Sequence, residues 1–291
     1  MTVLVYGATA RQGRAIAQAL IEEGRSVRTV SRFPKQAGVT LPAEIETWRA
    51  DLSDPASLDA AHEGVEAVVI TLPLVFDEAR FLSNGRAALA AAERAEVGRL
   101  IYNTSVAAAD RPVGDPVLDA IHAVASEMSS SGLHATVLRP PLFLENLIAP
   151  WTRPAIEIEG VLRYPLPGDR PVRWINADTI GRAAAAALKS DAAGEILDIS
   201  DIAPMTGAEL AGRLAGVLDR NVRYEAITPD AFARRAEPWF GREGAKHLAD
   251  LYRMIAATPQ LFDRDYDGPR HLLGFEPRPS DQWLEREFGG A

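Results

Sequence analysis

Short β-rich runs alternate with helical stretches through the first half of the chain, and this alternation constrains the fold most strongly. Strands that are separated by helices are typical of a parallel sheet with helices on its faces. Near-continuous apolar runs such as residues 67–71 suit strands that are buried on both sides. We therefore predict an α/β fold with a doubly wound parallel sheet. Its predicted strands cover residues 2–6, 26–30, 44–48, 67–71, 99–103 and 135–138.

Helix boundaries can be read between these strands. The helix after the first strand covers residues 11–23 and stops at Gly24, which suits a left-handed C-terminal cap. Asp54 and Pro55 read as an N-cap and a first-turn proline, and they begin a helix that runs to residue 61. Two further helices are predicted at residues 84–95 and 117–130.

Repeated prolines break regular structure after Pro140, so a region of shorter elements begins there. We predict that residues 1–140 form the sheet domain and that residues 175–200 complete it. Residues 141–174 and 201–291 are predicted to form a smaller, mixed α/β C-terminal lobe that binds a substrate or a partner. The elements predicted in this half are helices at 178–189, 207–218 and 229–235 and a strand at 195–199.

Composition excludes several classes of function. The formal charge of −9 and a pI of about 5.2 do not favour direct binding of nucleic acid. No apolar run approaches the ~20 residues of a membrane helix, so no membrane association is expected. The chain has no cysteine, and its five histidines are too scattered for a metal site. Because the first strand begins at once without a secretory signal, we expect a cytoplasmic protein.

A glycine-containing turn separates the first strand from the first helix. At this point a dinucleotide-binding fold of the Rossmann type places the pyrophosphate, because the free N–H groups of the helix attract anions. Gly7 would permit the tight turn and Gly13 the close packing of helix on strand, whereas Ala10 stands where glycine is usual. A plain strand-to-helix connection would also use such glycines. The candidate cofactor-binding residues of this turn are Gly7, Thr9, Ala10, Arg11, Gln12 and Gly13.

Basic residues follow the second strand. An NAD-selective site usually carries an acidic residue here, which bonds the ribose 2′-hydroxyl. This chain instead has Arg32 and then Lys35, and a guanidinium suits a 2′-phosphate. We therefore expect NADP(H) rather than NAD(H), the alternative being two solvated loop cations. After the third strand, Asp51 and Leu52 are candidates for the adenine edge, although Asp51 also suits a turn.

These motifs together resemble the NmrA-like family of atypical short-chain dehydrogenases/reductases. The resemblance rests on Gly7-Ala8-Thr9-x-x-x-Gly13, Ser31-Arg32-x-Pro34, Asp51-Leu52, Thr104-Ser105, Ser131-Gly132-Leu133-x-x-Thr136-x-Leu138-Arg139-Pro140, Phe143-x-Glu145-Asn146, Asp178-x-Ile180-Gly181 and Leu273-Gly274-x-x-Pro277-Arg278. It implies a Rossmann sheet, NADP(H) at the carboxyl ends of the strands and a substrate lobe after the sixth strand. Further candidate cofactor contacts at strand ends are Thr71, Leu72, Pro73, Thr104, Pro141 and Phe143.

The usual catalytic pair of short-chain reductases is missing. The family alignment places the lysine of the Tyr-x-x-x-Lys motif at about Ala123 and the tyrosine at Asp119. The remaining candidate catalytic residues are His122, Thr104 and Ser105. Imidazole titrates near neutrality and a hydroxyl can orient a substrate. A surface role for His122 and a capping role for Thr104 and Ser105 remain open.

Two functions are consistent with these observations. The first is an NADPH-dependent reductase of a small hydrophobic acceptor, such as a quinone or an activated enone, whose product can take its proton from water. The second is a non-catalytic NADP(H)-sensing protein that regulates a protein partner. The absent pair favours the sensor. Aromatic residues of the lobe would favour a substrate wall, with core packing as their alternative role: Phe143, Trp151, Tyr164 and Trp174.

Overall fold

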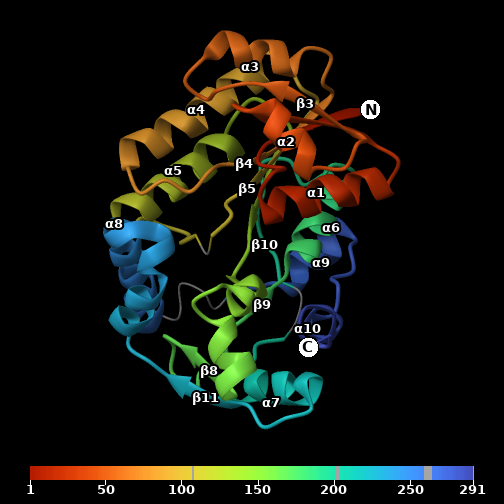
Figure 1. The fold of residues 1–291 in the computed structure, drawn as a ribbon. Coiled ribbons are helices and arrows are strands. Elements are labelled where there is room, and N and C mark those ends of the chain that lie inside the picture. The colour runs from red at the N-terminus through yellow and green to blue at the C-terminus, as the bar shows by residue number, and fades with distance from the viewer. Residues whose placement is uncertain (107, 201–202, 259–263, 291) are drawn as a thin grey trace. The chain divides into compact units, whose positions relative to one another are not determined.

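A seven-stranded parallel sheet forms the centre of the first part of the molecule (Figure 1). Its strands pair in the order β10-β6-β5-β4-β1-β2-β3, and every pair is parallel. The prediction of a doubly wound α/β fold is therefore confirmed. The strands are β1 (Thr2–Val5), β2 (Ser26–Ser31), β3 (Ile45–Arg49), β4 (Ala67–Thr71), β5 (Arg99–Asn103), β6 (Ala135–Arg139) and β10 (Ile196–Asp198).

This computed structural model describes residues 1–106, 108–200, 203–258 and 264–290, and the chain divides into two compact units. The first unit contains Met1–Pro141, Ala177–Ile199 and Asp265–Pro277. The second contains Leu142–Asn176, Ser200–Arg264 and Arg278–Ala291. Residues 265–277, predicted to lie in the lobe, belong to the first unit, because α9 (Asp267–Leu273) packs against α6 (Ala177–Ala187).

The order of strands reverses between β1 and β4. The chain adds β2 and β3 on one side of β1 and then returns to add β4 on the other side. In open α/β sheets such a reversal leaves a crevice at the carboxyl ends of the two strands, where ligands bind. The turn after β1 and the residues that follow β4 therefore border the expected site.

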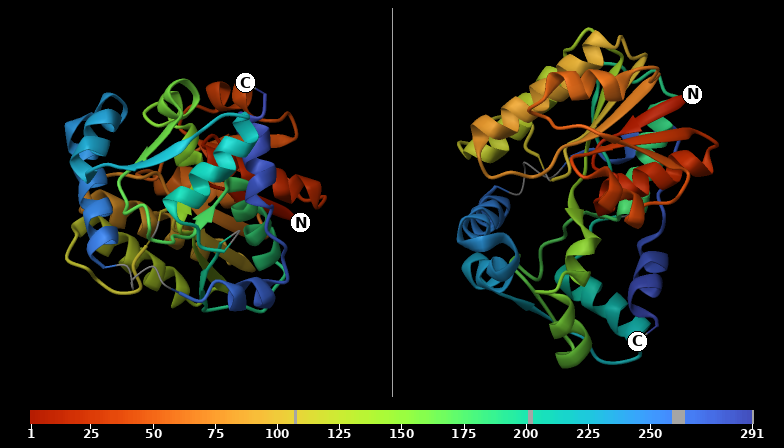
Figure 2. Two further views of the ribbon diagram at one scale, coloured as in Figure 1. Left: turned by 90° about the horizontal axis from the view of Figure 1, so that it is seen from below. Right: turned by 45° about the horizontal axis from the view of Figure 1, so that its top comes forward.

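Helices cover both faces of the sheet. Figure 2 shows α1 and α6 on one face and α3, α4 and α5 on the other. Aspartates cap α3, α4 and α5, since Asp54, Asp77 and Asp115 each accept a hydrogen bond from a first-turn N–H group. The bounds are α1 (Arg11–Glu22), α2 (Pro34–Thr40), α3 (Pro55–His62), α4 (Glu78–Arg94) and α5 (Pro116–Ser129).

Close packing of α6 on α1 explains one of the sequence motifs. Gly181 lies in α6, and a Cβ atom at this position would lie 2.4 Å from the backbone oxygen of Ala15 in α1. No real Cβ approaches an oxygen so closely, so only glycine lets the two helices meet here. Through this contact a segment that follows residue 176 becomes an integral part of the sheet domain.

The second unit is built on small sheets and helices around its own apolar core. Strands β7 and β9 form one parallel pair, and β8 and β11 form another. In the described parts of this unit no helix is both long and apolar enough to cross a membrane, and the same holds for the described parts of the first unit. The elements are β7 (Leu142–Phe143), η1 (Leu144–Ile148), η2 (Ala155–Glu159), β8 (Val161–Tyr164), β9 (Trp174–Ile175), α7 (Gly207–Leu218), β11 (Arg223–Ala226), α8 (Pro229–Ala257) and α10 (Ser280–Phe288).

Two of the four aromatic residues of the lobe, for which a substrate wall and core packing were the alternatives, are core residues. Tyr164 is 1% exposed and Trp174 is 3% exposed, and their rings meet edge to face at 5.2 Å. Tyr164 also contacts the rings of Phe232 and Tyr252. For these two residues the alternative of core packing therefore holds, because the unit uses them to fill its interior.

Candidate functional site

The turn between β1 and α1 requires glycine at two positions, Gly7 in the turn itself and Gly13 in the first turn of α1. Gly7 has a left-handed backbone with φ of 76°, and a Cβ there would lie 3.0 Å from the backbone oxygen of Thr71 at the end of β4. A Cβ on Gly13 would lie 2.2 Å from the backbone oxygen of Gly7. The first helix thus begins in direct contact with the turn, at the point where the strand order reverses.

The amino end of α1 is left open. Ala10 is its N-cap residue and has no side chain that can accept a hydrogen bond, and the first turn contains no acidic residue. The first N–H groups of an α-helix have no partner within the helix and carry partial positive charge. Helices α3, α4 and α5, on the other face of the sheet, close the same position with aspartate. The amino end of α1 is therefore suited to an anion such as a phosphate.

The side chain of Gln12 is occupied by contacts within the protein. Its Oε1 accepts a hydrogen bond from Nδ2 of Asn103 at 2.7 Å, and its Nε2 donates to the backbone oxygen of Ser105 at 3.2 Å. Asn103 Nδ2 also lies 3.4 Å from the hydroxyl of Thr71. The ends of β4 and β5 are thereby tied to the first turn of α1.

Asn103 was missed by our sequence reasoning. It is fully buried at the last position of β5, directly after the apolar Leu100-Ile101-Tyr102 run. A polar amide that ends a buried strand is a signal for a hydrogen-bonded site residue, because burying an unpaired amide is unfavourable.

The candidates Thr104 and Ser105 differ in what their hydroxyl groups do. Thr104 is 1% exposed, and its hydroxyl donates to the backbone oxygen of Val106 at 3.0 Å. Ser105 is half-buried and has a left-handed backbone with φ of 56°. Its hydroxyl makes no hydrogen bond within the described part of the chain. Ser105 is thus the better placed of the two to contact a ligand.

The basic residues after β2 face solvent. The guanidinium of Arg32 lies 5.8 Å from the ring centre of Phe33, and both side chains are exposed, as is that of Lys35 in the first turn of α2. Asp51 closes a turn, because its Oδ1 accepts hydrogen bonds from the backbone and hydroxyl of Ser53. These hydrogen bonds, with the nearby charge of Arg32, lower the pKa of Asp51.

Asp119 lies on α5, the helix that would carry a Tyr/Lys pair, and it has a structural role. Asp119 accepts hydrogen bonds from the backbone N–H groups of Val113 and Gly114, at 2.6 and 3.0 Å, and so fixes the loop before α5. His122 is half-buried on α5 and makes no side-chain hydrogen bond with the described residues. Tyr6 and Tyr102 do not substitute for the missing tyrosine, because both are buried and burial raises the pKa of each phenol.

The remaining candidates lie at other strand ends. Thr71 ends β4 and Leu72 follows it; both are buried, whereas Pro73 is exposed. Pro141 is buried at the end of a segment of the first unit, whereas Phe143 is half-buried in β7 of the second unit. At the end of β6, Arg139 forms a two-point ion pair with Asp198 of β10, at 2.7 and 3.0 Å. Leu52 is half-buried beside Asp51.

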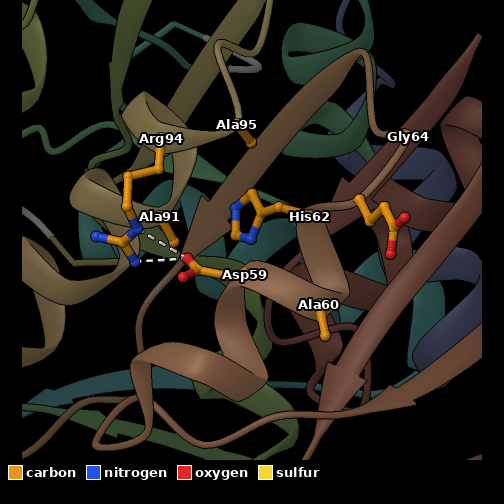
Figure 3. A pocket seen from close by; sticks show the side chains of 8 residues that line it. Asp59, Ala60, His62, Gly64, Ala91, Arg94 and Ala95 are labelled. Atoms are coloured by element: carbon orange, nitrogen blue, oxygen red, sulfur yellow. Dashed lines mark hydrogen bonds and ion pairs between the residues drawn. The ribbon is translucent and has the colours of Figure 1, made fainter.

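A hollow of about 480 Å³ lies elsewhere, at the carboxyl ends of α3 and α4 (Figure 3). The backbone N–H of Glu66, just after this end of α3, donates to the oxygen of Thr2 at the start of β1. The hollow is therefore at the amino edge of the sheet, away from the glycine turn. It is lined by Asp59, Ala60, His62, Glu63, Gly64, Ala91, Arg94 and Ala95.

His62 in this hollow makes the stability of the protein sensitive to acid. Its side chain is 1% exposed, its Nδ1 lies 2.8 Å from the backbone oxygen of Leu58, and burial lowers its pKa. The unfolded chain binds a proton at a pKa of about 6.5, so it binds more protons than the folded chain below that pH. Stability is therefore full above pH ~6.5 and falls as the pH is lowered towards the folded pKa.

The variant His62→Gln is expected to lose less stability than the native chain between pH 7 and pH 5. The difference is at most about 1.4 kcal/mol per pH unit, because only one proton is involved. Urea unfolding followed by circular dichroism at several pH values measures it. Equal pH slopes for the two chains would show that His62 takes up its proton equally well when folded.

Comparison with known proteins agrees with this geometry. The model of the NmrA-like family matches residues 1–262. An NAD(P)H azoreductase of Xenophilus azovorans is 31% identical over 229 residues, which cover 78% of this chain and 77% of the azoreductase. The triphenylmethane reductase of Citrobacter sp., solved with NADP(H), has a TM-score of 0.80 at 18% identity over 99% of both chains.

A second solved structure shares the fold. The NADPH-dependent quinone oxidoreductase of Escherichia coli, solved with NADPH, has a TM-score of 0.79 at 22% identity. The alignment covers 99% of this chain and 100% of that one. With the glycine turn, the parallel sheet and the family model in agreement over most of the sequence, the chain belongs to the NmrA-like family.

Proposed function

We propose that this protein is an NADPH-dependent reductase of a small hydrophobic acceptor, such as a quinone or an activated enone. The observation that carries the proposal is the amino end of α1, which has no capping side chain and lies next to the close contact between Gly7 and Gly13. This helix end lies where the strand order of the parallel sheet reverses. The named activities of its relatives support the class of acceptor, since they include an azoreductase, a quinone oxidoreductase and a triphenylmethane reductase.

Different residues of the site would contact different parts of the nucleotide. The backbone N–H groups at the start of α1 would hold the pyrophosphate. Arg32 and Lys35 would hold the 2′-phosphate, with Asp51 and Leu52 beside the adenine. The strand-end residues Thr71, Leu72, Pro73, Thr104, Ser105 and Pro141 would border the nicotinamide and the acceptor.

The protein's own contribution to the reaction is binding and orientation. NADPH supplies a hydride when bound. Asp119 is engaged by the loop before α5 and Ala123 carries no ionisable group, so neither delivers a proton in the manner of a Tyr/Lys pair. A reduced quinone collects its proton from water, and holding the acceptor in place can supply much of the rate.

Consumption of NADPH with a panel of acceptors tests the proposal. We expect turnover with quinones, azo dyes or activated enones, and negligible turnover with simple ketones, whose reduction needs an acid from the enzyme. Calorimetric titration with NADPH is run in parallel. Tight NADPH binding without turnover of any acceptor would favour an NADP(H) sensor, and rapid ketone reduction would show that another group, with His122 the first to test, supplies the proton.

A further inference from the structure

Ser105 has a backbone conformation that L-residues rarely adopt. Glu96, Ser105 and Asp219 are the non-glycine residues with positive φ in the described part of the chain. Glu96 follows the C-cap residue of α4 and Asp219 is the C-cap residue of α7, positions at which a left-handed residue is common. Ser105 instead follows a strand, β5, at the ligand edge of the sheet. Such strained residues occur at functional sites and persist only where their surroundings hold them.

Two side chains hold the backbone of Ser105 from both sides. Oδ1 of Asn103 accepts a hydrogen bond from the N–H of Ser105 at 3.2 Å, and Nε2 of Gln12 donates to its backbone oxygen, also at 3.2 Å. The 2.7 Å hydrogen bond between Asn103 and Gln12 joins the two holders. We call Gln12 and Asn103 the Ser105 clamp.

The clamp leaves the hydroxyl of Ser105 available. The backbone N–H and C=O of Ser105 are both hydrogen-bonded to the clamp, whereas its Oγ makes no hydrogen bond within the described residues. The neighbouring hydroxyl of Thr104 is used internally by Val106. The two clamp residues therefore hold the left-handed backbone of Ser105, although the hydroxyl of Ser105 makes no hydrogen bond that stabilises the described fold.

We propose that Gln12 and Asn103 are positioning residues that present the hydroxyl of Ser105 as a hydrogen-bond donor to the acceptor during reduction. This inference rests on the proposed reductase function. Gln12 also belongs to the turn proposed to hold the pyrophosphate, but it serves there through its backbone, while its side chain serves Ser105. The two roles can be separated by substitution of the side chain.

Kinetics of Gln12→Ala make the first test. We expect kcat with a quinone to fall about tenfold while the dissociation constant of NADPH stays within twofold, because the backbone N–H groups remain. The matched control is Gln18→Ala, which removes an exposed glutamine of the same helix whose side chain donates a hydrogen bond to Glu22. A large loss of NADPH affinity in Gln12→Ala would overturn the proposal, because the side chain would then be a cofactor contact.

A double-mutant comparison asks whether the clamp acts through the hydroxyl. In a Ser105→Ala background, Gln12→Ala and Asn103→Ala are expected to cause no further fall in kcat. Asn103→Asp keeps the acceptor for the N–H of Ser105, so it should retain more activity than Asn103→Ala in the native background. A further tenfold fall in the Ser105→Ala background would overturn the proposal, since the clamp would then act on something else.

A third test needs neither cofactor nor activity. Ser105→Gly removes the left-handed strain, so the Tm of the native chain should rise by about 2 °C. In Gln12→Ala, where the loop is released, the same change should raise Tm by less than half as much. An equal rise in both backgrounds would show that Gln12 does not hold the conformation. If no acceptor is reduced but these shifts appear, the proposed function fails while the clamp stands.

Discussion

Gly13→Ala is expected to lower the free energy of unfolding by about 3 kcal/mol, the upper end of what overpacking costs. The added Cβ would lie 2.2 Å from the oxygen and 2.4 Å from the carbonyl carbon of Gly7, and both are backbone atoms. Backbone cannot rotate aside as a side chain does, so α1 must shift away from the turn. The shift moves the N–H groups proposed to hold the pyrophosphate, and NADPH binding should weaken at least tenfold as well.

Gly38→Ala is the matched control for this change. Gly38 lies in α2, has no neighbour within 4 Å of an added Cβ and has an ordinary helical backbone. Alanine there should be neutral or stabilise the chain by up to about 1 kcal/mol. Urea unfolding and calorimetric titration of both variants make the comparison. Similar small effects at both positions would mean that the contact of Gly13 with the turn is not needed for folding or binding.

Arg32→Ala is expected to weaken NADPH binding by about 1.5–3 kcal/mol, which is roughly 10- to 150-fold, with little effect on NADH. The guanidinium is exposed after β2, at the position that bonds the ribose 2′ group in this kind of fold. Only NADPH carries a phosphate there. Calorimetric titration with both nucleotides gives the two affinities.

Arg94→Ala serves as the control for charge. Arg94 is also a partly exposed arginine of the first unit, but it pairs with Asp59 at the amino edge of the sheet. Its removal changes the net charge equally and should leave both nucleotide affinities unchanged. An equal loss of NADPH and NADH affinity in Arg32→Ala would assign Arg32 to a feature that the two nucleotides share.

Local patterns in the sequence were sufficient to predict the parallel sheet. Strands such as β4 are buried on both faces, so their apolar runs and the helices between them predict a parallel arrangement. Helix α4 begins at Glu78 rather than at residue 84, because Asp77 caps it and Phe81 already belongs to its buried face. Helix α2 was not predicted, since it has only seven residues, starts with proline and includes Gly38.

The site was less accessible to sequence reasoning because its contacts are distant along the chain. Gln12 and Asn103 are 91 residues apart, and no local pattern indicates that they bond. The role of Asp119 depends on a loop conformation rather than on helix periodicity. In the second unit, helix α8 extends to Ala257, far beyond the predicted end at residue 235, past Pro238 and a break at Gly241. A proline and a glycine within a helical stretch normally predict its end.

The discontinuity of the first unit has a consequence for how the chain is made. A ribosome delivers β1 to β6 first, and β6 is then an edge strand with unpaired N–H and C=O groups. Its partner β10 and helix α6, which covers α1, emerge only after residues 142–176 have been synthesised. Helix α9 follows later still. Until then the nascent chain exposes an apolar face and an open edge, so an amino-terminal fragment that ends before α6 should aggregate where the whole chain folds.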